Sequence, residues 1–117
     1  MDRRILYLKK QMLLNIQSSA TIDEMAKSVN LSASHLLRLF KSETGASPIQ
    51  FLRNLRLKKA RELLEETFKR VNEISFEVGM FDQSHFIRDF TQKYGSTPSA
   101  YRKKHWAKLE MDEAENN

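Results

Sequence analysis

The sequence contains no cysteine, and it has only three glycines and two prolines among its 117 residues. Without thiols the chain can form no disulfide, no cysteine-based zinc site and no cysteine nucleophile. The scarcity of glycine and proline leaves few positions at which a helix must end. No run of 18 apolar residues occurs, and the N-terminus lacks the apolar core of a signal peptide. From these absences we expect a cytoplasmic protein without a membrane partner.

Charge is distributed unevenly along the chain. The formal net charge is +5, from 20 basic and 15 acidic residues. Four of the acidic residues lie in the last eight positions, at Glu110, Asp112, Glu113 and Glu115. The remainder, with 20 basic and 11 acidic residues, therefore carries +9. Such a basic body indicates a polyanionic partner, either nucleic acid or an acidic membrane surface, although solvated charge without any partner is the alternative.

The residue pattern predicts an all-α protein. Apolar and polar residues nowhere alternate with period two for long enough to form a strand, whereas residues 4–17 place apolar side chains on one helical stripe. Thr21 and Glu24 have the spacing of a capping box, which opens a second helix. The expected helices cover residues 4–17, 22–29, 33–44, 48–66, 71–78, 83–94 and 98–107. Residues 110–117 are polar, and we expect an acidic disordered tail there.

Turn and cap residues separate these helices in the same way in both halves of the chain. Asn30 and Gly79 each tolerate a left-handed turn between a short helix and a longer one. Ser32 is a suitable N-cap for the first longer helix. Each longer helix is then closed by a Gly-x-Ser/Thr-Pro segment, at 45–48 and at 95–98, whose proline can open the next helix.

The second half of the chain repeats the first. The stretch SASHLLRLF at 32–40 recurs as QSHFIRDF at 83–90, and six identities fall at an offset of 50 where average composition would give roughly one. The identical positions of the first copy are Ser34, His35, Arg38, Phe40, Gly45 and Pro48. Each copy reads as a short helix, a tight turn and a longer helix, with a small residue, Ala26 or Ser75, where the two helices cross. This arrangement is the helix-turn-helix plan.

Both longer helices are predicted to have an apolar side and an opposite side with a central arginine. At 100° per residue, the core sides are Ala33, Leu36, Leu39 and Phe40 in the first helix and Gln83, Phe86 and Phe90 in the second. The outer sides are Ser34, Arg38 and Lys41 in the first and Ser84, Arg88 and Thr91 in the second. A helix fits the major groove, and one arginine can donate hydrogen bonds to both O6 and N7 of guanine. We therefore predict that these outer sides contact bases in the major groove of DNA.

Several of these side chains also have a simpler interpretation. Arg38 and Arg88 could be solvated or held in salt bridges. Leu37 and Ile87 could meet a thymine methyl or complete the core, and for Ile87 we favour the core. The three histidines have no paired carboxylate spacing that would make a metal site. No nucleophile–base pair and no glycine-rich phosphate loop is visible, so we expect neither an enzyme nor a cofactor.

Two long segments carry the repeat, IDEMAKSVNLSASHLLRLFKSETGASP at 22–48 and VNEISFEVGMFDQSHFIRDFTQKYGSTPSAYR at 71–102. Together they resemble the DNA-binding domain of the AraC/XylS family of bacterial transcription regulators, and the resemblance covers residues 5–105. It implies an all-α, seven-helix domain of two helix-turn-helix subdomains joined by a long linker helix. The chain departs from the family pattern at Ser75, at Arg70 and at Thr91, which stands where a lysine is common.

The resemblance implies a division of the chain into four parts. The first helix-turn-helix subdomain is expected at 1–47, the linker helix at 48–66, the second subdomain at 67–109 and the acidic disordered tail at 110–117. A linker of that length spans about 27 Å, near the ~34 Å between successive major grooves on one face of DNA. We therefore expect helices 33–44 and 83–94 of one monomer to read two successive major grooves of bent DNA.

The predicted function is that of a sequence-specific DNA-binding transcription regulator, an activator, with double-stranded DNA and RNA polymerase as partners. Many family members carry an N-terminal sensing or dimerisation domain. Because Met1 directly precedes the first helix, we favour a C-terminal piece of such a regulator over a small stand-alone one. The alternative function is a basic helical protein–protein interaction module without sequence-specific DNA binding. Steep salt dependence of binding distinguishes the two.

The expected DNA contacts lie on the two longer helices and beside them. Base contacts are expected from Ser34, Leu37, Arg38, Gln83, Ser84 and Arg88. Phosphate or flanking contacts are expected from Ser32, His35, Lys41, Ser42, His85, Lys93 and Arg102.

Overall fold

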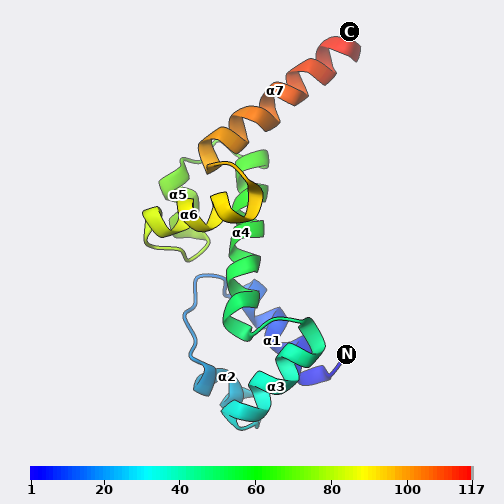
Figure 1. Cartoon of the computed structure of the whole chain (residues 1–117), viewed down its shortest axis with the longest axis vertical. Coiled ribbons are helices and arrows are strands. Elements are labelled where there is room, and N and C mark those ends of the chain that lie inside the picture. The colour runs from blue at the N-terminus through cyan, green and yellow to red at the C-terminus, as the bar shows by residue number, and fades with distance from the viewer. Residues whose placement is uncertain (117) are drawn as a thin grey trace. The chain divides into compact units, whose positions relative to one another are not determined.

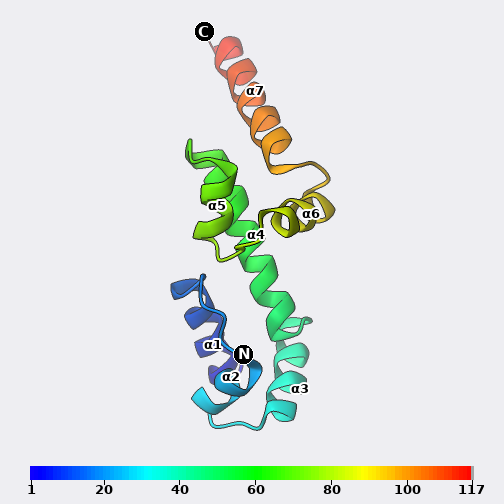
Figure 2. The ribbon, with the colours of Figure 1, turned by 90° about the vertical axis from the view of Figure 1, so that its left-hand side faces the viewer.

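The computed structural model describes residues 1–116, and among them it contains seven α-helices and no strand. In chain order the helices are α1 (Arg3–Leu14), α2 (Ile22–Ser28), α3 (Ala33–Thr44), α4 (Pro48–Glu66), α5 (Val71–Glu77), α6 (Gln83–Tyr94) and α7 (Pro98–Asn116). The chain forms two compact units, Met1–Arg56 and Leu57–Asn117, and the boundary between them falls inside α4. Figures 1 and 2 show the order of the helices in two views. The predicted all-α, seven-helix class is confirmed.

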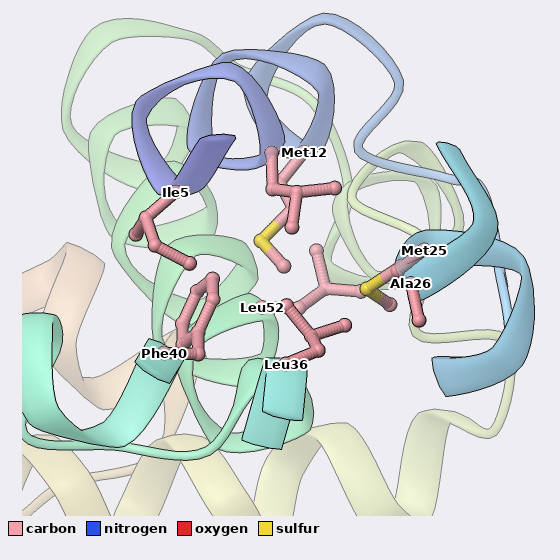
Figure 3. Packing of buried hydrophobic residues seen from close by; sticks show 8 residues of the cluster. Ile5, Met12, Met25, Ala26, Leu36, Phe40 and Leu52 are labelled. Atoms are coloured by element: carbon pink, nitrogen blue, oxygen red, sulfur yellow. The ribbon is translucent and has the colours of Figure 1, made fainter. Parts of the chain in front are cut away.

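In the first unit, α1, α2, α3 and the beginning of α4 enclose one apolar core. Its centre is formed by Ile5 of α1 and by Leu36 and Phe40 of α3, which are all fully buried. Figure 3 shows Ile5 facing the Phe40 ring, with Leu52 of α4 in the same cluster. Burying side chains of this size contributes about 1.5–3 kcal/mol each. The apolar side of α3 is thereby fixed inward, and its opposite side is turned to solvent.

In the second unit, α5, α6, the end of α4 and the beginning of α7 enclose a core that is richer in aromatic rings. Phe86 and Phe90 of α6 are fully buried. The Phe90 ring lies 4.7 Å from the Tyr94 ring and 5.6 Å from the Tyr101 ring, measured between centroids. Contacts of this kind favour edge and offset arrangements of the rings, which orient α6 against α7. The second half of α7 extends away from α5 and α6 (Figures 1 and 2).

The predicted caps and turns are confirmed. Thr21 and Glu24 form the capping box at the start of α2. Asn30 adopts a left-handed conformation with φ 61°, which asparagine tolerates better than most residues, and Gly79 does the same with φ 85°. Gly45 ends α3 with φ 80°. These conformations stop each helix at the position that the sequence indicated.

The structure corrects the expected ends of two helices. α1 ends at Leu14, where residues up to 17 were expected to be helical. α7 continues to Asn116, although a helix to about 107 and a disordered tail at 110–117 were expected. Residues 110–116 are therefore helical, and residue 117 lies outside the described residues. The reason is that no glycine or proline follows Pro98, while Ala, Glu, Leu, Lys and Met, all good helix formers, fill the segment.

The linker helix α4 is shared between the two cores. Leu52 is buried in the first core, whereas Leu57, Ala60 and Leu64 are buried in the second. Each part of α4 thus packs against the core of the unit in which it lies. The four-part division of the chain at residues 47, 66 and 109 stays a prediction. Within residues 1–116, no helix is both long and apolar enough to cross a membrane.

Candidate nucleic-acid interface

The first candidate reading helix is α3, which displays polar side chains opposite its buried Leu36 and Phe40. Ser32 is its N-cap, and the Ser32 hydroxyl accepts a hydrogen bond of 3.2 Å from the backbone N–H of His35. Leu37 is 41% exposed, so this side chain is accessible beside the polar ones. The exposed residues that the sequence predicted on this helix and its cap are Ser32, Ser34, His35, Leu37, Arg38, Lys41 and Ser42.

Arg38 lies at the centre of the exposed side of α3. Within residues 1–116 its guanidinium forms no hydrogen bond and no salt bridge with another side chain. All of its donors therefore face solvent and are available to an external acceptor. Of the two simpler interpretations of this arginine, a salt bridge within the unit is absent from the described residues, and an arginine that is only solvated stays the alternative.

The second candidate reading helix is α6, which has the same length and the same plan. Its N-cap is Asp82, whose carboxylate accepts a 3.1 Å hydrogen bond from the backbone N–H of His85. That hydrogen bond lowers the pKa of Asp82 below its usual value. This cap was not predicted from the sequence, although Asp82 stands 50 residues after Ser32, so the repeat itself contained the signal. The exposed predicted residues are Gln83, Ser84, His85, Arg88 and Lys93.

Some side chains of α6 differ from the predicted arrangement. Gln83 was assigned to the core side, but it is exposed because it is the first residue of the helix and lies beyond the buried cluster. Thr91 was assigned to the outer side, but it is half-buried, and its hydroxyl donates a 2.6 Å hydrogen bond to the Ile87 carbonyl. Ile87 is half-buried and packs against the core, as predicted.

The arginine of the second helix has a neighbour that the first lacks. Arg88 Nε lies 3.7 Å from a carboxylate oxygen of Asp89, and the Arg88 side chain is 60% exposed. The exposed guanidinium of Arg88 forms no hydrogen bond within residues 1–116. Lys93 lies over the ring of Tyr94, 5.9 Å from its centroid.

Each short helix crosses its longer partner at a small buried residue. Ala26 and Ser75 are each 2% exposed. The carbonyls of these two residues accept equivalent backbone hydrogen bonds of 2.9 Å, from Leu31 and from Met80 respectively. The additional hydroxyl of Ser75 donates to the Met80 carbonyl, so this departure from alanine leaves no buried polar group unpaired. Both turns are therefore held by the same backbone geometry.

Among the arginines predicted to contact DNA, Arg102 is the one whose guanidinium donates hydrogen bonds to backbone carbonyls of its own unit. Its Nε donates a hydrogen bond of 3.1 Å to the Leu64 carbonyl, and a terminal nitrogen donates one of 3.2 Å to the Thr67 carbonyl. In the first unit Arg56 plays the corresponding part, donating 2.8 Å to the carbonyls of Ile16 and Ser18. We assign both arginines to the support of the helices. The phosphate contact of Arg102 stays a prediction.

Known DNA-binding regulators share this arrangement of helices. A family model described as a helix-turn-helix domain matches residues 25–104, which include α3 and α6. The chain is 34% identical over 102 residues to the transcriptional regulator MtrA of Neisseria gonorrhoeae, covering 87% of this chain and 34% of MtrA. It belongs to the AraC/XylS family. The chain thus spans about a third of the length of the curated relatives it matches.

Two further similar proteins agree with this assignment. The lactose operon transcription activator of Staphylococcus xylosus is 39% identical over 88 residues, covering 75% of this chain and 32% of that protein. An AraC-type transcriptional regulator structure from Chromobacterium violaceum superposes with a TM-score of 0.81 at 29% identity, covering 88% of this chain and 92% of that one.

A solved complex with DNA is also similar. The DNA-binding domain of the global transcriptional factor AdpA, crystallised with a target DNA, superposes with a TM-score of 0.85 at 26% identity. The match covers 90% of this chain and 95% of the AdpA domain. This AraC/XylS chain therefore has the fold of a domain that binds its target DNA.

Proposed function

We propose that this chain binds double-stranded DNA sequence-specifically through α3 and α6, as the DNA-binding part of a transcription activator. The observation that carries the proposal is the pairing of two equivalent helices. Each buries its phenylalanines and exposes an arginine with a serine one turn before it. Small side chains let a helix approach the floor of the major groove, and arginine is the commonest reader of guanine there.

Two further features support DNA as the ligand. Residues 1–109 carry an excess of nine positive charges, which favours a polyanion. The AdpA domain, which shares the fold, was solved on a target DNA. The predicted base contacts are Ser34, Leu37, Arg38, Gln83, Ser84 and Arg88, and the predicted phosphate contacts add Ser32, His35, Lys41, Ser42, His85, Lys93 and Arg102.

The proposal extends to the protein as a whole. Because the matched relatives are about three times as long, we infer a regulator in which a sensing or dimerisation domain accompanies this chain. RNA polymerase is the partner that an activator must reach, and the exposed residues of α2 and α5 are available for it. Because the proposed ligand is double-stranded DNA, we infer that the protein acts in the cytoplasm.

The decisive experiment is selection from random duplex DNA, with the wild-type chain beside Arg38→Ala and Arg88→Ala. Two short boxes about one helical turn apart, each losing its preference in a different variant, are expected if α3 and α6 each read one groove. One box alone would show that the second helix holds the backbone without reading bases. No enrichment, together with binding that salt leaves unchanged, would favour the alternative of a protein–protein interaction module.

A further inference from the structure

The two reading helices, α3 and α6, differ in charge at matching positions. The offset of 50 pairs Ser32 with Asp82 and Leu39 with Asp89, so α6 gains a carboxylate at two positions. The same offset pairs Lys41 with Thr91, so α6 also loses a cation. At all three positions the second helix is the more negative one.

The two N-caps make the same capping hydrogen bond, and they differ in charge. Ser32 and Asp82 both adopt extended backbone conformations and both accept the N–H of the residue three positions on, at 3.2 and 3.1 Å. The N–H groups and the dipole at a helix start attract phosphate. The Ser32 cap is neutral, so the start of α3 can still attract an external anion. At Asp82 an ionised carboxylate already occupies the position and repels a second anion.

The remaining two pairs act in the same direction. The carboxylate of Asp89 lies 3.7 Å from Arg88 and partly neutralises it, whereas Arg38 has no such neighbour among the described residues. Thr91 directs its hydroxyl to the Ile87 carbonyl, so it offers no donor in place of the ammonium group of Lys41.

One pair has the opposite sign and offsets only part of the difference. Glu43 of α3 is matched by Lys93 of α6. The Glu43 carboxylate is half-buried and accepts a 3.1 Å hydrogen bond from the backbone N–H of Asp2, so it faces α1 rather than the outer side of α3. Lys93 lies in the last turn of α6 over the Tyr94 ring, at the far end from Asp82.

We propose that Asp82 and Asp89 weaken the electrostatic hold of α6 on DNA, so that α3 supplies most of the phosphate-derived affinity. The inference rests on the proposed function and adds to it a ranking of the two reading helices. Asp82 is exposed at the start of α6, and the half-buried Asp89 pairs with Arg88. Both carboxylates reduce the attraction of α6 for any DNA sequence, so binding through α6 depends more on the base contacts that it makes.

A reciprocal exchange of charge at the two N-caps tests this ranking. Asp82→Asn removes a carboxylate and keeps the cap, because asparagine and aspartate cap equally well, and Ser32→Asp adds a carboxylate in the same way. Asp112→Asn is the matched control, because it removes one exposed carboxylate from the end of α7, where no DNA contact is expected. Affinity for the selected duplex and for a random duplex is measured across a range of salt concentrations.

We expect Asp82→Asn to tighten binding about 2- to 5-fold, the size of a charge effect at a helix terminus, and to steepen the salt dependence. We expect Ser32→Asp to weaken binding by at least as much, and Asp112→Asn to change it by less than about twofold. Circular dichroism of both cap variants confirms that the helices are kept, and if Ser32→Asp unfolds, Asp82→Asn decides alone.

An Asp82→Asn affinity no higher than that of Asp112→Asn, with the wild type binding its duplex normally, overturns the ranking but leaves the proposed function intact. A wild-type chain that binds no duplex in a salt-dependent way overturns the proposed function itself, and the ranking with it. The two failures differ in whether the wild type binds.

Discussion

The Nε of Arg102 donates a 3.1 Å hydrogen bond to the carbonyl of Leu64, in the last turn of α4. Carbonyls in the last turn of a helix lack partners within it, so a cation from α7 meets both that need and the negative end of the helix dipole. Arg56 of α4 donates instead to the carbonyls of Ile16 and Ser18, in the segment that follows the end of α1. In each unit, therefore, an arginine from the helix that follows the reading helix binds carbonyls at or just after the end of the helix that precedes the helix-turn-helix.

Arg102→Ala is expected to destabilise the second unit by about 1–3 kcal/mol, because two charge-assisted hydrogen bonds to half-buried carbonyls are lost. Urea unfolding followed by circular dichroism measures the change. Lys103→Ala is the control, since this neighbour is exposed, and it is expected to stay within about 0.5 kcal/mol of the wild type. Equal stability of the two variants would contradict the supporting role of Arg102.

Tyr101 is expected to ionise only in strongly alkaline solution. Burial of the phenol and its hydrogen bond to Glu65 raise the pKa of Tyr101 to about 12 from the ordinary value of 10. Because the folded-state pKa is the higher one, the stabilisation is fully present below pH 10 and is lost as the pH rises through about 12. Absorbance titration of the wild type beside Tyr101→Phe should show the variant lacking this late phenolate. If Tyr101→Phe titrated like the wild type, the tyrosine that ionises at high pH would be a different one.

Gly45→Ala and Gly95→Ala are each expected to cost about 1–2 kcal/mol, because alanine is strained in the left-handed conformation. The φ values are 80° and 82°, and an added Cβ meets nothing within 4 Å at either position. The backbone strain is therefore the whole cost, and Gly45→Asn should recover part of it. Thermal unfolding tests both, and equal losses at the two positions would agree with their equivalent geometry.

Arg38→Lys is expected to separate base reading from charge. Lysine keeps the positive charge but lacks the planar pair of donors, so about 1–3 kcal/mol of discrimination at one base pair should be lost. The salt dependence of binding should stay nearly unchanged, whereas Arg38→Ala should reduce it. Titration of the preferred duplex and of single-base variants provides the measurement. Unchanged base preference in Arg38→Lys would exclude bidentate reading by this residue.

The repeat made much of the fold predictable. Capping and turn residues are local, because they act within a few positions of the backbone, so Thr21, Asn30 and Gly45 marked helix ends correctly from sequence alone. The end of α7 was missed because composition was taken as a sign of disorder, whereas helix propensity carries the segment on to Asn116.

For the candidate interface, helical periodicity was sufficient to place Arg38 and Arg88 on exposed sides, because the buried phenylalanines fix the rotation of each helix. Periodicity failed at Gln83, since the first residue of a helix lies beyond the core that its angular position faces. Periodicity also could not reveal that the Thr91 hydroxyl donates to the Ile87 carbonyl. At one angular position around the helix, a threonine hydroxyl can point either to solvent or to a carbonyl of its own helix.

The sequence by itself determined the helical class, the duplicated unit and the two exposed arginines, since all of these follow from residue type and spacing along one helix. Only the tertiary structure decided what the other arginines do. Arg56 and Arg102 have the same chemistry as Arg38, and they differ in that helix packing brings distant carbonyls within 2.8–3.2 Å of their donors. Such contacts join residues 35 to 40 positions apart, a separation at which no local pattern operates.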